Sequence, residues 1–354
     1  MDNNLINKKQ LSQKIKHWGS ELGFQQVGIS PIDLGETEKF LHQWLAKDYH
    51  GEMDFMQKHG LKRTRPALLE SGTQSIISLR MDYYPPAFNS QQALKNPQQA
   101  FISRYALGRD YHKLIRKKIQ KLAQKITSEI GEFGYRAFTD SAPIMEKPIA
   151  QQAGLGWIGK HSNLINSSAG SYFFLGELYT NIDLIYDAPA TNHCGSCQQC
   201  MIACPTDAIV EPYVVDARLC ISYLTIELKG AIPIELRSKM GNHIYGCDDC
   251  QICCPWNRFT EITAEKDFYP RHELDQATLL KLFLWTEQEF LKNTEGSAIR
   301  RIGYQRWLRN IAVALGNSKA DSETLKILNQ TQENQSPLLQ EHIEWAIQQL
   351  TKKI

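Results

Sequence analysis

The sequence of 354 residues contains no hydrophobic run long enough to span a membrane. A spanning helix needs about 20 consecutive apolar residues. The most apolar stretch, residues 170–186, includes Glu177, Asn181 and Asp183. The first ten residues, MDNNLINKKQ, have neither the apolar segment nor the paired arginines of an export signal. We therefore expect a cytoplasmic protein that does not enter the membrane.

A strong net charge is also absent. The chain has 40 Lys and Arg against 38 Asp and Glu, so the formal charge of +2 does not indicate a partner of either sign. Hydrophobic residues make up 42% of the chain, which is enough to build cores and excludes a largely disordered protein. The length predicts two or three domains.

Cysteine is missing from the first 193 residues and from the last 100. All nine cysteines lie between Cys194 and Cys254. Disulfides are not expected in a reducing cytosol. Cysteines packed this closely and regularly indicate a metal site.

Residue patterns predict an α+β domain over residues 1–190, a cysteine-rich domain over 191–262 and a helical region over 275–354. In the first domain we expect a helix and then a strand within residues 1–30. Apolar spacing predicts further helices over 35–48 and 110–131, and another that starts near Ser141. Strands are expected over 74–83, 136–139 and 170–183.

The C-terminal region shows paired helical patterns. Apolar residues from Trp307 to Leu315 fall at helical spacing, and Gly316-Asn317 is a typical helix end. Ser336-Pro337 is a typical helix start. Paired helices joined by short turns resemble HEAT repeats.

The first cysteine motif is the bacterial ferredoxin run. Cys194, Cys197, Cys200 and Cys204 are followed by Pro205 at the spacing of that run. Three thiolates of such a run hold one iron–sulfur cluster, and the fourth reaches a second cluster. Structural zinc is the alternative, although zinc is usually held by two separated cysteine pairs.

The second motif is incomplete. Cys247, Cys250 and Cys254-Pro255 keep the ending of the run but lack one thiolate, which Cys220 can supply. Eight ligands then hold two 4Fe–4S clusters, and Cys253 is left as a free thiol. The alternative is one cluster with a zinc site. The first cluster would take Cys194, Cys197, Cys200 and Cys254, and the second would take Cys204, Cys220, Cys247 and Cys250.

Two other segments carry possible chemistry. Residues 154–161, GLGWIGKH, nearly match two phosphate-binding templates, but a helical pattern precedes them and His161 replaces the Ser or Thr of a P-loop. We expect a tight loop beside a large flat or phosphate-bearing cofactor, with nucleotide binding as the alternative. Asp140 and Ser141 precede the expected helix, so the simplest role of either residue is an N-cap.

Taken together, these segments resemble the epoxyqueuosine reductase family. The resemblance covers most of the chain. It rests on both cysteine motifs and on residues 62–63, 104–112, 140–146, 154–160, 220–225 and 306–310.

This resemblance implies a cobalamin-dependent enzyme with two 4Fe–4S clusters, related to the reductive dehalogenases, whose N-terminal fold is nitroreductase-like. Such an enzyme removes the epoxide oxygen of epoxyqueuosine at the wobble base of tRNA, the last step of queuosine synthesis. The departing oxygen must be protonated, which favours an acid of raised pKa. The resemblance assigns this catalytic role, beside the cofactor, to Asp140. The residues it implies for contact with cobalamin are Arg63, Ser103, Asp140, Trp157, Lys160, Ser171, Ser222 and Lys229.

The alternative function is a reductase of a small organic substrate, or an electron-transfer protein. Arg300, Arg301 and Arg306 lie close together with Tyr304 and no acidic residue between them, a pattern that suits RNA. A solvated helix face would explain the same pattern. The family resemblance further implies a tRNA partner and an external electron donor of the flavodoxin or ferredoxin type. We expect a monomer.

Overall fold

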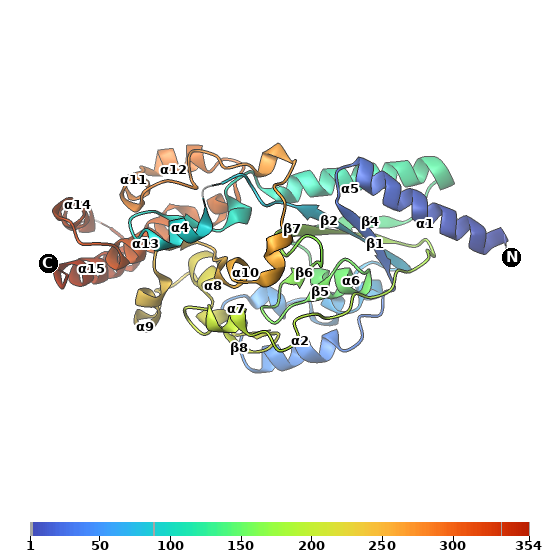
Figure 1. Cartoon of the computed structure of the whole chain (residues 1–354), viewed down its shortest axis with the longest axis horizontal. Helices are drawn as coiled ribbons and strands as arrows, with labels where there is room; N and C mark the ends of the chain where they lie inside the picture. Colours follow the sequence, from blue (N-terminus) through green and yellow to red (C-terminus); the bar gives the residue numbers. More distant parts are fainter. Residues whose placement is uncertain (1–2, 88, 334, 354) are drawn as a thin grey trace.

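The computed structural model describes residues 3–87, 89–333 and 335–353. The molecule is elongated, and the first helix and the last two helices lie at opposite ends (Figure 1). Its central sheet has four antiparallel strands in the order β1-β2-β7-β4. These strands are β1 (Gln26–Ser30), β2 (Ser75–Asp82), β4 (Tyr135–Phe138) and β7 (Phe173–Thr180).

Different helices cover the two faces of this sheet. On one face, α1 (Asn3–Glu21) and α5 (Tyr111–Ile130) bury apolar residues such as Ile119 against Leu178 of β7. On the other face, the short helix α6 (Glu146–Gln152) and the turn after it come very close to β1. A Cβ atom at Gly28 would lie 2.0 Å from the carbonyl oxygen of Ala153, so this strand position requires glycine.

The cysteine-rich segment consists of short elements. The helices α7 and α10 each carry one cysteine, and Cys220 caps the start of α8. The bounds of the helices are α7 (Gln199–Ile202), α8 (Ile221–Ile226), α9 (Ile234–Arg237) and α10 (Asp249–Ile252). The bounds of the strands are β8 (Ile209–Glu211), β9 (Val214–Val215) and β10 (His243–Tyr245).

The C-terminal part is helical, and α13 packs against α15. Its helices are α11 (Leu279–Phe283), α12 (Glu287–Asn293), α13 (Gly303–Asn317), α14 (Ser322–Gln332) and α15 (Pro337–Thr351). The remaining elements are α2 (Thr37–Ala46), α3 (Pro66–Leu69), α4 (Ser90–Lys95), β3 (Phe101–Ile102), β5 (Trp157–Ile158) and β6 (Leu164–Ile165).

The core of the helical part extends beyond the C-terminal residues. Strand β3 pairs with β10, and residues 100–107 pack in one cluster with residues of α13 and α15. A segment from the first 190 residues therefore belongs physically to the helical part, because its apolar side chains are buried there.

Most of the expected elements are present. The helix expected over 110–131 and the start expected at Ser336-Pro337 are confirmed, and the Ser336 hydroxyl accepts a hydrogen bond from the backbone N–H of Leu339. The helix expected near Ser141 begins only at Glu146. Its N-cap is Met145, so the N-cap role considered for Asp140 or Ser141 is wrong. Within the described residues, no helix is both long and apolar enough to cross a membrane.

Arg309 joins the helical part to the cysteine-rich segment. Its side chain is fully buried, and its guanidinium donates to the carbonyl oxygens of Leu224, Leu228 and Gly230. Burial lowers the pKa of this guanidinium to about 9. These carbonyls end α8 and the turn after it, so Arg309 supplies the donors that a helix end lacks.

We expect Arg309→Met to keep most of the packing volume but to leave these carbonyls without donors. The free energy of unfolding should fall by about 2–5 kcal/mol. The thermal midpoint checks this, with Lys326→Met on the exposed face of α14 as the control. A midpoint equal to that of the control would contradict the structural role of Arg309.

Candidate functional site

Asp140 lies in the loop after β4, beside the start of α5. Its Oδ2 accepts a hydrogen bond from the Tyr111 hydroxyl at 2.9 Å and lies 3.2 Å from Nε2 of His112. The other ring nitrogen of His112 lies 2.6 Å from the Asp110 carboxylate. The ring of Tyr111 stacks on Phe174 with a centroid distance of 3.8 Å. Helix α5 therefore fixes two proton-bearing groups against one carboxylate.

The neighbouring carboxylates of Asp110 and Asp140 keep His112 protonated. Burial would lower the pKa of His112, but the hydrogen bonds and charges of Asp110 and Asp140 outweigh it and raise the pKa to about 9. Burial likewise opposes ionisation of Asp140, but the hydrogen bonds from His112 and Tyr111 lower its pKa. The raised pKa expected for Asp140 is therefore wrong. At neutral pH the carboxylate is ionised and the neighbouring imidazole is protonated.

Two further carboxyl groups, those of Glu146 and Glu177, lie near Asp140. Glu146 opens α6, and Glu177 is fully buried in β7. Burial, with the charge of Asp140, raises the pKa of Glu146 to about 7. Burial and the neighbouring Glu146 raise the pKa of Glu177 well above its usual range. The sequence analysis assigned no role to Tyr111, His112 or these two glutamates. A single glutamate inside an otherwise apolar strand was the available signal for Glu177.

Asp140 lines a cavity of about 490 Å³ together with Arg300 and Arg301. Nη2 of Arg301 donates to both carboxylate oxygens of Glu227, at 2.7 and 2.8 Å, and so forms an ion pair. Arg300 is exposed and donates to the carbonyl oxygen of Leu291. Two of the three arginines expected to bind tRNA therefore line the same cavity as Asp140.

Arg306 is placed differently. Its guanidinium donates to the carbonyl oxygens of Ile226, Arg301 and Ile302. The protein's own backbone thus occupies the donors of Arg306, which supports the turn that carries Arg300 and Arg301.

A second cavity of about 420 Å³ adjoins the first, and Tyr105 and Ser222 line both. Four of the cysteines line one part of it. Its other lining residues include the aromatic and apolar side chains of Tyr83, Phe173 and Leu175, and the hydroxyl groups of Ser103 and Ser171. His161 also lines this cavity, and its Nε2 is buried with no hydrogen-bond partner among the described residues.

Of the other residues expected to contact cobalamin, Asp140 lines the adjoining cavity, and the remaining four line neither of these two cavities. Arg63 donates to the carbonyl oxygens of Phe55 and Met56, and the backbone N–H of Lys229 donates to Glu52. Lys160 donates to the carbonyl oxygens of Gly195 and Cys197. Trp157 packs edge-on against His193 and Trp256. Lys160 and Trp157 thus lie at the first cysteine motif.

The cysteines divide between two cavities. Cys204, Cys220, Cys247 and Cys250 line the cavity of about 420 Å³ that adjoins the cavity of Asp140. Cys194, Cys197, Cys200 and Cys254 line another cavity, of about 240 Å³. Cys253 lines neither of these, and its thiol contacts the carbonyl oxygen of Cys250 at 3.5 Å. This division matches the two ligand sets expected from the sequence.

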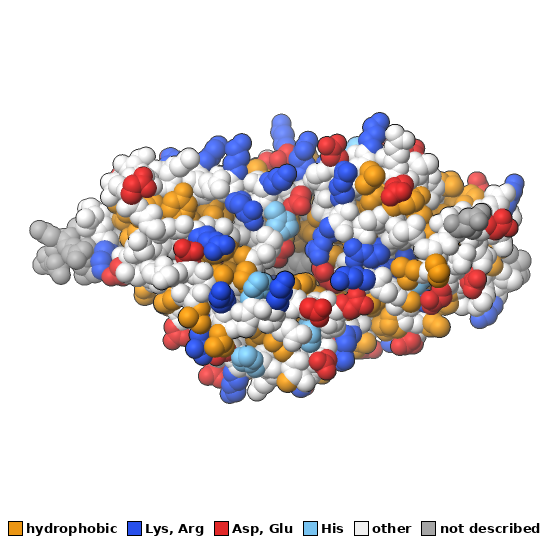
Figure 2. All heavy atoms as spheres, turned by 180° about the vertical axis from the view of Figure 1, so that it is seen from behind, with side chains coloured by type: hydrophobic (Ala, Val, Ile, Leu, Met, Phe, Trp, Pro, Cys, Tyr) orange, Lys and Arg blue, Asp and Glu red, His pale blue; other side chains and the backbone are white. Residues whose placement is uncertain are grey.

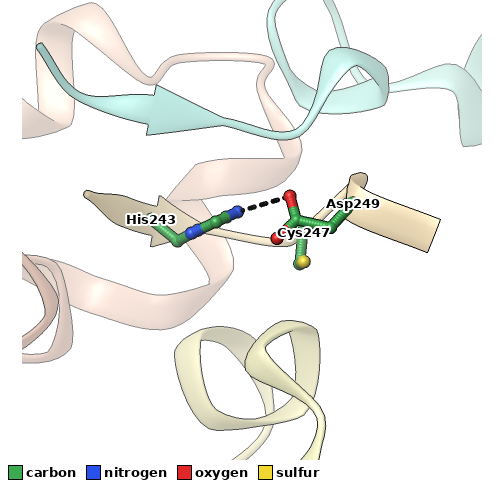
Figure 3. A group of neighbouring side chains, drawn as sticks. All are labelled: His243, Cys247 and Asp249. Carbon is green, nitrogen blue, oxygen red and sulfur yellow. Dashed lines mark hydrogen bonds and ion pairs between the residues drawn. The ribbon is translucent and has the colours of Figure 1, made fainter. Parts of the chain in front are cut away.

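Polar groups surround the second set of cysteines. His243 on β10 lies 3.0 Å from the Asp249 carboxylate, and the Cys247 sulfur lies within 4.8 Å of the side-chain ligand atoms of both residues (Figure 3). The neighbouring Asp248 is buried and accepts hydrogen bonds from the Ser103 hydroxyl and from the backbone N–H of Arg104. These contacts fix the loop that carries Cys247 and Cys250, as polar neighbours commonly do around a metal site.

Two family models match the chain. The model described as "Epoxyqueuosine reductase QueG, DUF1730" matches residues 63–141, which include the Asp140 loop. The model described as "4Fe-4S double cluster binding domain" matches residues 193–257, which include all nine cysteines.

Known proteins match over nearly the whole length. The epoxyqueuosine reductase of Pseudomonas aeruginosa is 59% identical, over 95% of this chain and 94% of its own. That of Escherichia coli is 58% identical, over 97% and 90%. A crystal structure of an epoxyqueuosine reductase with an epoxyqueuosine-modified tRNA stem loop is 27% identical, with a TM-score of 0.86 over 96% of this chain and 90% of that one.

The cysteine division predicts the iron content. The reconstituted protein should hold about eight iron atoms, four for each cluster. Cys253→Ala should keep all of them, whereas Cys220→Ala should lose about half. Iron and sulfide analysis with the absorption spectrum checks this. Full iron in the Cys220 variant and loss of iron in the Cys253 variant would contradict the ligand sets.

Proposed function

Since the chain belongs to the epoxyqueuosine reductase family, we propose that it reduces epoxyqueuosine in tRNA to queuosine with cobalamin and two 4Fe–4S clusters. One observation carries the proposal. The cavity of Asp140, Arg300 and Arg301 adjoins the cavity lined by four cysteines, and Ser222 and Tyr105 lie between them. Electrons and a proton can therefore reach one substrate from two sides.

The lining of the cysteine-lined cavity suits cobalamin. Its volume of about 420 Å³ lies within the ~300–1,000 Å³ of ordinary small-molecule sites, and it adjoins the cavity of Asp140. Apolar and aromatic walls suit a flat macrocycle, and Ser103, Ser171 and Ser222 suit its polar side groups. The unpartnered N–H of His161 offers a buried donor to a bound group. When bound, cobalamin supplies the reducing metal centre, which is chemistry that amino-acid side chains lack.

The cysteines suit two clusters. Each set of four lines its own cavity, and one set lies directly at the cobalamin cavity. Burial and neighbouring charges raise the pKa of Cys247 and Cys250 well above the usual range, so both thiols keep their protons until iron binds and displaces them. Lys160, through the carbonyl groups of Gly195 and Cys197, holds the first cysteine loop.

The residues around Asp140 supply the proton. His112 holds it at Nε2, against Oδ2 of Asp140. As charge develops on the departing epoxide oxygen, the ionised Asp140 accepts this proton from His112 and passes it to the oxygen, and His112 then regains a proton from solvent. Asp110 stabilises the imidazolium and orients the ring through the other nitrogen. Tyr111 fixes the carboxylate through its hydroxyl.

Arg300 and Arg301 suit the tRNA side of the pocket. Arg300 is exposed, while the pair with Glu227 orients Arg301 toward the cavity of Asp140. On one face of the molecule, Lys and Arg side chains gather near the middle with acidic residues among them (Figure 2). Such groups bind phosphates, which fix the register of a nucleic acid. Arg306 acts by positioning the turn.

The domain assignments follow from this arrangement. Residues 1–190 form a nitroreductase-like cobalamin domain, 191–262 a ferredoxin-like domain and 275–354 a HEAT-like region that contributes to tRNA binding. The protein acts in the cytoplasm as a monomer, where an external donor of the flavodoxin or ferredoxin type reduces the clusters. The three domain assignments are supported by the sheet, by the two cysteine sets and by the packing of α13 against α15.

Asp140→Asn should retain the clusters and cobalamin but lose turnover. Asparagine keeps the size of the side chain and cannot relay a proton, so the rate should fall by about 10²–10⁴. Conversion of epoxyqueuosine to queuosine, followed by mass spectrometry of tRNA nucleosides, measures the effect. Wild-type turnover in this variant would remove Asp140 from the chemistry.

Arg300→Glu should weaken tRNA binding, more strongly at low salt. Each lost phosphate contact lowers the slope of log affinity against log salt by about one. Lys326→Glu on α14 makes the same change of charge away from the pocket and should bind tRNA normally. If the two variants bind tRNA equally across a salt series, Arg300 does not contact tRNA, as a small-molecule reductase would predict.

A further inference from the structure

Glu177 is a carboxylic acid in a place that disfavours its charge. Its side chain is fully buried in β7, and neither of its oxygens meets a hydrogen-bond donor among the described residues. It pairs across the sheet with Ser78 of β2 and Phe138 of β4. A buried charge without a partner is strongly unfavourable. The Glu177 carboxyl instead contacts the Glu146 carboxyl, which requires a proton between them.

Glu146 in turn holds the backbone of Asp140. The backbone N–H of Asp140 donates to Oε1 of Glu146 across the loop that precedes α6. Asp140 has φ = +53°, in the left-handed region that residues with a side chain rarely adopt. Such a conformation persists only where surrounding contacts enforce it. The contact to Glu146 therefore holds the backbone of Asp140 in this conformation, while Tyr111 and His112 hold its carboxylate.

We propose that Glu146 and Glu177 share one proton and together act as a latch that positions Asp140. Glu146 accepts the hydrogen bond from the Asp140 backbone, and Glu177 holds the Glu146 carboxyl in place through the shared proton. Both are positioning residues. This inference rests on the proposed function only for the role of Asp140. An epoxyqueuosine reductase from Bacillus subtilis, 27% identical with a TM-score of 0.85, has been solved with an aspartate-bearing catalytic loop swung out of its active site.

Charged groups from each neighbouring element act on this pair. Asp140 raises the pKa of both glutamates, while Lys147 of α6 lowers that of Glu146. His112 and Tyr111 of α5, and more distantly Arg301, act on Asp140. Tyr179 of β7 stays neutral beside the pair, because burial raises its pKa.

The latch should weaken as the pH rises. Since both glutamates have raised pKa values, the shared proton favours the closed loop at low pH. That contribution is lost as the pH rises through about 7 and beyond, when both carboxyls ionise and repel each other. Glutamine in place of Glu177 donates an N–H to Glu146 without needing a proton, so it removes this dependence.

Hydrogen exchange of the peptide that contains Asp140, measured without tRNA, tests the latch. Glu146→Ala should lower the protection factor by about 10- to 100-fold, the factor for losing a hydrogen bond to a charged group. Glu146→Gln keeps an acceptor and should remain near wild type. Glu177→Gln should keep its protection as the pH rises, whereas the wild type loses it. Glu129→Ala, on the outer part of α5, is the control carboxylate and should change nothing.

Unchanged protection in Glu146→Ala would overturn the latch. A loss of protection with pH in Glu177→Gln equal to that of the wild type would overturn the shared proton. The glutamine variants decide the question even if the alanine variant fails to fold. A protein that shows the expected protection but leaves epoxyqueuosine intact would refute the proposed function and not the latch.

Discussion

Removal of an epoxide oxygen requires electrons that break the carbon–oxygen bonds and protons that reach the departing oxygen, and the two must not combine with each other first. Two adjoining cavities meet this constraint here. One is lined by four cysteines and the other by Asp140, and Tyr105 and Ser222 line both. Strands β4 and β7 of the central sheet position the residues around Asp140, which we propose to supply the proton. Helices α8 and α10 position cysteines of the other cavity, which we propose to supply the electrons. Shared packing of residues 100–107 with the helical part holds the two sides in fixed relation.

In the proposed mechanism, His112 stores the proton and Asp140 delivers it. An isolated acid in a closed pocket would keep its own proton, as the sequence analysis expected of Asp140. The structure instead places the proton on His112, with Asp110 and Asp140 on either side of the ring. An ionised Asp140 beside an imidazolium is ready to relay a proton after each turnover, because its donor lies within hydrogen-bond reach.

The sequence predicted what depends on local pattern. The cysteine spacing predicted two sets of four, and the structure groups the same residues in two cavities. Helix α15 and its Ser336 cap were also predictable, because a cap is a local signal. Long-range contacts were not. Nothing near Glu177 in the sequence shows that Glu146 lies against it, and the arginine pattern around Arg306 does not reveal that backbone carbonyls occupy its donors.

The most direct measurement uses the reconstituted protein with cobalamin, a low-potential reductant and tRNA that carries epoxyqueuosine. Mass spectrometry of the digested nucleosides reports the product. The account predicts the loss of one oxygen atom from epoxyqueuosine, and no loss when cobalamin or reductant is left out. A protein with full iron and bound cobalamin that leaves the nucleoside unchanged would contradict it.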